Sequence, residues 1–154
     1  MKKTTPDHKT EAFRSLSRAY SDASILMHEA IARKAGLSGT DHKYLGLILQ
    51  KKELTAGELA QLTGLTTGAV TGLIDRLEKK ELVKRQFTKD DRRKVLIVPQ
   101  EQKAMELMAP LFADLQSKTL ELIASFSETE LQVIERYFTG AIQIMQDTTQ
   151  SLNQ

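Results

Sequence analysis

The 154-residue sequence contains no cysteine and no tryptophan, and it has only three prolines and few aromatic residues. Without cysteine, the chain has no disulfide, no thiolate nucleophile, no cysteine-ligated zinc and no cysteine redox switch. No apolar run approaches the roughly 20 residues that span a bilayer, and the basic first three residues are not followed by the apolar core of a signal peptide. We therefore expect a single soluble, cytoplasmic domain with an aliphatic, mainly helical core.

Positive charge is concentrated in one segment of the chain, although the net charge is only +2. The segment from Arg76 to Lys94 holds nine basic and four acidic residues, so it is +5 and the remainder of the chain is −3. A basic patch on a slightly acidic body is typical of a protein that docks one face on phosphates. Charge runs are also common on solvated surfaces, so this feature alone leaves nucleic-acid binding open.

Long amphipathic helices are predicted at both ends of the chain. Residues 10–35 carry apolar side chains at three- and four-residue steps, and Gly36 ends that helix. The C-terminal region 100–150 contains two more helices, the second of which starts at the capping box Ser127–Glu130 and has two apolar faces. Because two faces need two partners, we predict that 10–35 and 100–150 are the dimerisation helices of a homodimer. An intramolecular bundle is the alternative.

The central region 40–98 predicts a winged helix-turn-helix lobe. Thr40 or Asp41 can cap its first helix, a short helix follows the capping box Thr55–Glu58, and a further helix runs from Thr66 or Thr67 to Lys80. A helix-turn-helix needs a small residue where its helices cross, a turn residue that tolerates left-handed geometry, and apolar residues that hold the last helix at a steep angle. Ala60 is the small residue, Gly64 is the turn residue, and the apolar residues are Leu65, Val70 and Leu73. Residues 82–88 and 94–98 form a β-hairpin with a charged tip, and Pro99 ends its second strand. The predicted fold is therefore mostly α with a small β-hairpin wing.

Candidate DNA-binding residues lie at the start of the last helix of this lobe and at the tip of the wing. Small and hydroxylated residues allow close approach to a groove, and arginines reach phosphates, guanine edges or a narrow minor groove. The candidates are Thr66, Thr67, Gly68, Thr71, Arg76, Lys89, Asp91, Arg92 and Arg93. Thr66 can also serve only as a helix cap, and Asp75 can be the structural partner of Arg76.

The run Leu73-Ile-Asp-Arg-Leu-Glu-Lys-Lys80, the wing and Asp91-Arg-Arg93 resemble the multiple-antibiotic-resistance regulator (MarR) family. The resemblance implies a dimer built by the flanking helices, with 66–80 as the major-groove recognition helix. It also implies that Arg93 is the minor-groove arginine and that Asp91 supports it. Two departures are Glu81, where the family often has glycine, and residues 99–103, where a Leu-Thr-Glu-Lys-Gly segment is common.

The function expected from these features is sequence-specific binding of double-stranded DNA by a transcription regulator. Dimer symmetry predicts a pseudo-palindromic operator with half-sites one helical turn apart. The resemblance implies a repressor that a small aromatic or amphipathic effector releases, and the candidate lining residues are Ser24, Met27, His28, His42 and Tyr44. No cofactor, metal or membrane partner is expected.

Two other functions remain open from the sequence. One is a metal-responsive regulator of the same fold, with His28, His42 and either Glu29 or Asp41 as ligands. The other is a helical partner-binding protein without DNA affinity. An enzyme is not expected, because no glycine-rich phosphate loop, nucleophile elbow or suggestive carboxylate pair is present.

Overall fold

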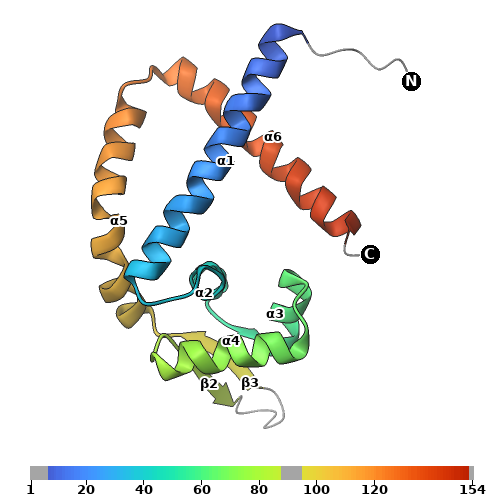
Figure 1. The fold of residues 1–154 in the computed structure, drawn as a ribbon, viewed down its shortest axis with the longest axis vertical. Coiled ribbons are helices and arrows are strands. Elements are labelled where there is room, and N and C mark those ends of the chain that lie inside the picture. The colour runs from blue at the N-terminus through green and yellow to red at the C-terminus, as the bar shows by residue number, and fades with distance from the viewer. Residues whose placement is uncertain (1–6, 88–94, 153–154) are drawn as a thin grey trace.

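A computed structural model describes residues 7–87 and 95–152 of the chain (Figure 1). The elements in chain order are α1 (His8–Lys34), α2 (Gly39–Lys51), β1 (Leu54–Thr55), α3 (Ala56–Thr63), α4 (Thr67–Lys79), β2 (Val83–Phe87), β3 (Val95–Pro99), α5 (Glu101–Ala124) and α6 (Glu128–Leu152). The mostly helical fold with a small sheet confirms the predicted winged helix-turn-helix architecture. No helix in the described ranges is long and apolar enough to cross a membrane.

Local signals in the sequence set most of the helix ends. Both predicted capping boxes are present: Glu58 accepts a hydrogen bond from the amide of Thr55, and Glu130 accepts one from the amide of Ser127. Gly36 follows α1 with a φ of 67°, as expected of a helix C-terminus. The start of α2 was predicted wrongly, because Ser38 caps it through a 3.0 Å bond from the amide of Asp41 to the Ser38 hydroxyl.

The sheet has three antiparallel strands in the order β1-β3-β2, whereas the sequence predicted only the β2–β3 hairpin. In the hairpin Val83 pairs with Pro99 and Phe87 with Val95. The additional strand β1 pairs with the other edge of β3, where Leu54 lies opposite Ile97. A two-residue strand is too short to show alternation, so the sequence carries no period-2 signal for it.

The hydrophobic core sits between α2, α3, α4 and the sheet, within the winged lobe. Its largest fully buried side chains are Leu45, Ile48, Leu59, Val70, Leu73, Ile74, Leu77, Val83 and Ile97. The end of α1 and the start of α5 join this core through Ala32 and Ala104, which are also buried. The lobe is therefore anchored to the C-terminal end of α1 and the N-terminal end of α5.

The long helices α1, α5 and α6 form an open frame above the lobe, in which α1 crosses α6 (Figure 1). Phe13 of α1 meets Tyr137 of α6 edge-on at a centroid distance of 4.8 Å, and the Ser17 and Tyr137 hydroxyls are 2.8 Å apart. No residue of α6 is buried within the chain. Large exposed apolar side chains include Leu16, Leu26, Leu120, Leu122, Val133, Ile142, Ile144 and Met145. A single chain therefore does not bury these faces in an intramolecular bundle.

Gly64→Ala should lower the free energy of unfolding by about 1 kcal/mol, because an L-residue with left-handed geometry costs about 1–2 kcal/mol. Gly64 has a φ of +70°, and a Cβ there would meet no atom within 4 Å, so the penalty is one of backbone conformation alone. Gly46→Ala is the matched control: it has the same open space inside α2 and should raise stability by up to about 1 kcal/mol. Urea unfolding at one protein concentration measures both. Equal effects of the two substitutions would contradict the turn assignment.

Candidate nucleic-acid interface

The turn between α3 and α4 holds the two helices at a fixed angle. Gly64 ends α3 with φ 70° and ψ 10°, and its amide donates to the carbonyl of Ala60 at 2.9 Å. The Thr63 hydroxyl donates to the carbonyl of Leu59 at 2.7 Å, which satisfies another acceptor at the helix end. These contacts match the geometry that the sequence predicted for the turn.

Helix α4 has one buried and one bare face. Val70, Leu73, Ile74 and Leu77 are at most 1% exposed and pack into the lobe core. Four predicted DNA-binding residues, Thr66, Thr67, Gly68 and Thr71, are exposed at the N-terminal half of the helix.

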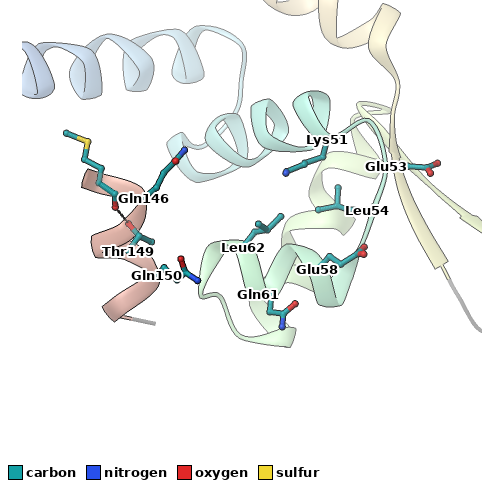
Figure 2. Close-up of a pocket in the computed structure, with 10 residues that line it drawn as sticks. Lys51, Glu53, Leu54, Glu58, Gln61, Leu62, Gln146, Thr149 and Gln150 are labelled. Atoms are coloured by element: carbon teal, nitrogen blue, oxygen red, sulfur yellow. Dashed lines mark hydrogen bonds between the residues drawn. The ribbon is translucent and has the colours of Figure 1, made fainter. Parts of the chain in front are cut away.

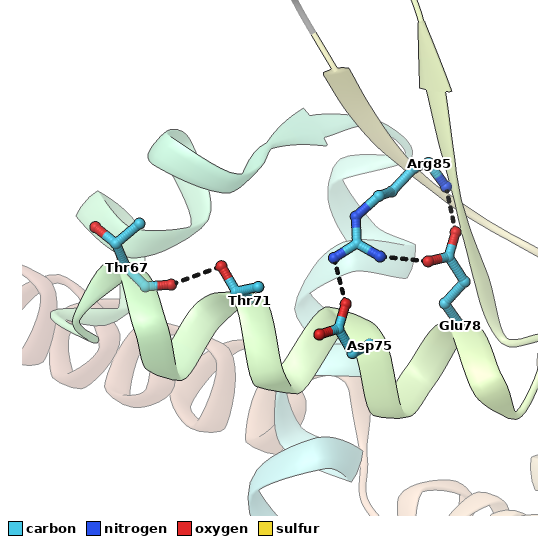
Figure 3. Close-up of polar contacts among 5 residues, drawn as sticks. All are labelled: Thr67, Thr71, Asp75, Glu78 and Arg85. Carbon is cyan, nitrogen blue, oxygen red and sulfur yellow. Dashed lines mark hydrogen bonds and ion pairs between the residues drawn. The ribbon is translucent and has the colours of Figure 1, made fainter.

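The exposed face of α4 has small side chains and carries hydroxyl groups. The Thr66 hydroxyl caps α4 by accepting from the amide of Ala69 at 3.3 Å, as the alternative for this residue foresaw. The Thr71 hydroxyl donates to the carbonyl of Thr67 at 2.9 Å (Figure 3). A Cβ on Gly68 would meet no atom within 4 Å, so the surface beside it is open. Another molecule can thus approach the α4 backbone closely at this end.

Arg76 bonds to another helix of the lobe instead of projecting freely from α4. Its Nε donates to both carboxylate oxygens of Asp41, at 3.2 and 3.0 Å, and its Nη2 donates to one of them at 2.7 Å. Asp41 lies on α2 and is 4% exposed, whereas the Arg76 side chain is 54% exposed. The hydrogen bonds to Asp41 raise the pKa of Arg76 above its ordinary value.

This arrangement corrects one expectation for Arg76. Its hydrogen-bonding partner is Asp41, not Asp75, which lies next to it in the sequence. The guanidinium forms a forked bond that joins α2 to α4, and its contact with a phosphate or a guanine edge stays a prediction, because 54% of the side chain is exposed. No pattern in the sequence predicts this pair, because Asp41 suits both a helix cap and a metal ligand.

Asp75 bonds to the wing instead. Arg85 on β2 donates through Nη2 to Asp75 at 2.6 Å and through Nη1 to Glu78, and its backbone amide donates to Glu78 at 3.0 Å (Figure 3). We call Arg85, Asp75 and Glu78 the Arg85 clamp. In the sequence Arg85 stands out only as one member of the basic segment, and its bond to α4 was not predicted.

The clamp and the Asp41 bond reduce the positive charge that the basic segment can offer to phosphates. Of its described cations, Arg76 and Arg85 are paired with acids, while Lys79, Lys80 and Lys84 are exposed. The other predicted binding residues, Lys89, Asp91, Arg92 and Arg93, lie outside the described residues.

Two of the five predicted effector residues meet where α1 and α2 approach α5. The His28 and His42 rings have centroids 5.4 Å apart, and each lies 6.1 Å from the Phe112 ring of α5. Burial, and secondarily the neighbouring His28, lowers the pKa of His42 below its ordinary value of 6.5. The sequence did not identify Phe112 as part of this cluster.

The other three predicted effector residues are distributed differently. Ser24 lies one helical turn before His28 and shares its side of α1, whereas Met27 is the sequence neighbour of His28 and faces a different side; both residues are half-buried. Tyr44 packs against the lobe core, on a different side of α2 from His42, because side chains two positions apart on a helix do not face each other.

The metal-site alternative finds little support in the described part of the chain. Asp41 is bonded to Arg76, and no group of three or more histidine, aspartate or glutamate residues is placed to hold a metal ion among the described residues.

A shallow pocket of about 840 Å³ lies between the lobe and the end of α6 (Figure 2). Lys51, Leu54, Glu58, Gln61 and Leu62 face it from the lobe, and Met145, Gln146, Thr149 and Gln150 face it from α6. None of the five predicted effector residues lines it.

Comparison with known proteins agrees with this geometry. The sequence profile of the MarR family matches residues 35–94. An uncharacterized HTH-type transcriptional regulator of Bacillus subtilis, YcgE, is 37% identical over 139 residues, which cover 90% of this chain and 90% of the relative. The chain belongs to the MarR family of helix-turn-helix transcription regulators.

Solved structures of MarR type share the fold at lower identity. A MarR family protein from Bacillus stearothermophilus superposes with a TM-score of 0.71 at 24% identity, covering 93% of this chain and 99% of the other. FabT from Streptococcus pneumoniae, solved in complex with DNA, has a TM-score of 0.69 at 18% identity and covers 90% of this chain and 97% of its own.

The two departures of this MarR-family chain from the common pattern meet in space. Glu81 has a φ of 59°, a left-handed geometry that glycine adopts without penalty. Its carboxylate pairs with Lys103 on the first turn of α5, within the segment 99–103 that also departs from the pattern. This pair lowers the pKa of Glu81 and links the end of α4 to α5.

Asp41→Asn and Arg76→Gln should each destabilise the protein, with a coupling energy of about 1 kcal/mol or more between them in a double-mutant cycle. Asp114 and Lys118 on α5 are a matched control, because their contact is also 2.7 Å but both side chains are exposed. Their coupling should stay below about 0.5 kcal/mol. Urea unfolding measures both cycles, and an Asp41–Arg76 coupling no larger than the control would refute a structural link.

Acidification below about pH 6.5 should destabilise the fold through His42. The folded state keeps His42 neutral, so between the ordinary value of 6.5 and its lower folded pKa the unfolded chain binds more protons, and stability falls as pH falls. Thermal melting of His42→Asn should depend less on pH across this window. His8→Asn, in the exposed first turn of α1, is the control and should leave the dependence unchanged. An unchanged dependence in His42→Asn would argue against this assignment.

Proposed function

We propose that this MarR-family protein binds double-stranded DNA by inserting α4 into the major groove. The observation that carries the proposal is the bare N-terminal half of α4, where Thr67, Gly68 and Thr71 are exposed opposite a fully buried apolar face. Hydroxyls and open backbone at a helix N-terminus suit contacts with base edges and phosphates. The DNA complex of FabT, which shares the fold, is in keeping with this use of the lobe.

The binding unit in this proposal is a homodimer joined by α1, α5 and α6. These helices leave large apolar side chains exposed in one chain, such as Leu122, Val133 and Ile144. A second copy of the chain would bury them in a dimer interface. Two symmetry-related lobes then read a pseudo-palindromic operator with half-sites about 10 base pairs apart. Sedimentation of the purified protein as a monomer at micromolar concentration would refute this part.

Regulation in the proposal is repression, relieved by a small aromatic or amphipathic effector that binds beside Ser24, Met27, His28 and His42. Support comes from the position of the His28–His42–Phe112 cluster, where α1 and α5 meet α2 of the lobe. A ligand inserted there would change the angle between the frame and the lobe, and thereby the spacing of the two recognition helices.

The direct test is binding of the purified protein to its own upstream intergenic duplex and to a scrambled duplex of equal length, over a salt series. Selective binding that weakens as salt rises supports a DNA-binding regulator. Binding to neither duplex at low salt would favour the partner-binding alternative.

Thr67→Ala combined with Thr71→Ala should reduce discrimination between the two duplexes, because the pair removes hydroxyls from the groove-facing side of α4. The expected loss is about 1–3 kcal/mol on the selected duplex, with little change on the scrambled one. Thr148→Ala on α6 is the control, since its hydroxyl makes the same kind of bond to the carbonyl four residues earlier. Unchanged selectivity of the double variant, with an unchanged melting temperature, would contradict the placement of α4.

A further inference from the structure

Arg85 faces the recognition helix because of the alternation of β2. Val83 is buried toward the core, Lys84 is exposed on the opposite side, and Arg85 returns to the side of Val83. There it meets α4, with its side chain 32% exposed. The same guanidinium thus contacts two carboxylates on successive turns of one helix, Asp75 and Glu78 (Figure 3).

The two carboxylates lie where negative charge opposes the proposed function. Thr67, Thr71 and Asp75 are spaced four residues apart and form one row along α4, as Figure 3 shows. Asp75 continues the row that we place against DNA, and its side chain is 59% exposed. A free carboxylate there would repel phosphates, and Glu78 would add a second negative charge one turn away.

The backbone of Arg85 also forms a hydrogen bond at the open edge of the sheet. Strand β2 is an edge strand in the order β1-β3-β2. Glu78 accepts the backbone amide of Arg85 at 3.0 Å, so α4 covers part of this edge. One residue therefore links the first strand of the wing to the recognition helix through its backbone and through its side chain.

We propose that Arg85 is a positioning residue for DNA binding: it neutralises Asp75 and Glu78 so that the outer face of α4 can approach the phosphate backbone. The proposal rests on the DNA-binding function proposed above. In it Arg85 acts through the two carboxylates and makes no base contact of its own. Hydrogen bonds to Asp75, and then to Glu78, raise the pKa of Arg85 above its ordinary value.

The test compares Arg85→Gln in two backgrounds, the wild-type chain and the Asp75→Asn/Glu78→Gln variant. With the carboxylates present, Arg85→Gln should weaken binding to the upstream duplex by about tenfold or more at 0.1 M salt. With both carboxylates neutral, the same substitution should change affinity by less than about threefold, because no uncompensated charge remains. The glutamine at position 78 keeps an oxygen for the amide of residue 85, so the edge contact is retained.

Lys84→Gln is the matched control, since it removes one positive charge from the adjacent residue on the opposite side of β2. It should weaken binding by a similar small factor in both backgrounds, because Lys84 carries no ion pair within the described residues. Melting temperatures are recorded for every variant, so that loss of fold is separated from loss of affinity. Should the single Arg85→Gln variant unfold, a tenfold loss in the carboxylate-free background still overturns the proposal.

A tenfold loss that persists without the carboxylates overturns the proposal, because it means that Arg85 contacts DNA itself or acts only as a scaffold. An affinity unchanged by Arg85→Gln in both backgrounds overturns it as well. A wild-type protein that binds no duplex overturns the proposed function and this inference together. Selective wild-type binding with a persistent loss refutes only the role of Arg85.

Discussion

The lobe depends on the burial of one apolar stripe, that of α4. Val70, Leu73, Ile74 and Leu77 face the core, and the helix cannot rotate without exposing them. Burial of each such side chain contributes about 1.5–3 kcal/mol, so rotation is strongly opposed. Orientation of the opposite face follows from this constraint, because side chains at the other positions of the helix have nowhere else to point. Burial of the apolar stripe therefore holds the hydroxyl groups of Thr67 and Thr71 on the exposed side of α4.

Several charged residues near α4 form ion pairs that link elements of the fold. Asp41 and Arg76 join α2 to α4, Glu81 and Lys103 join the end of α4 to α5, and the Arg85 clamp joins α4 to the wing. All three ionic links involve α4 or the turn that follows it. A count of basic residues along the sequence consequently overstates the charge available to phosphates.

Features governed by near neighbours in the chain were predictable from the sequence. The capping boxes at Thr55 and Ser127, the left-handed turns at Gly36 and Gly64, and the two faces of α4 depend on residues within a few positions of one another. The partners of Arg76 and Phe112 were not predictable. Arg76 bonds to Asp41, which lies 35 positions away in the sequence. A single sequence contains no signal for this pair, because Asp41 also suits the cap of a helix.

Thr55 occupies two roles that belong to different parts of the lobe. It pairs with Leu96 in the sheet, and its hydroxyl and amide begin α3. The register of the wing strand and the starting point of the helix-turn-helix are consequently set by one residue, and neither can slide without the other. Under the proposed function, a tilt of the lobe would therefore carry strand β3 and the start of the helix-turn-helix in the same direction.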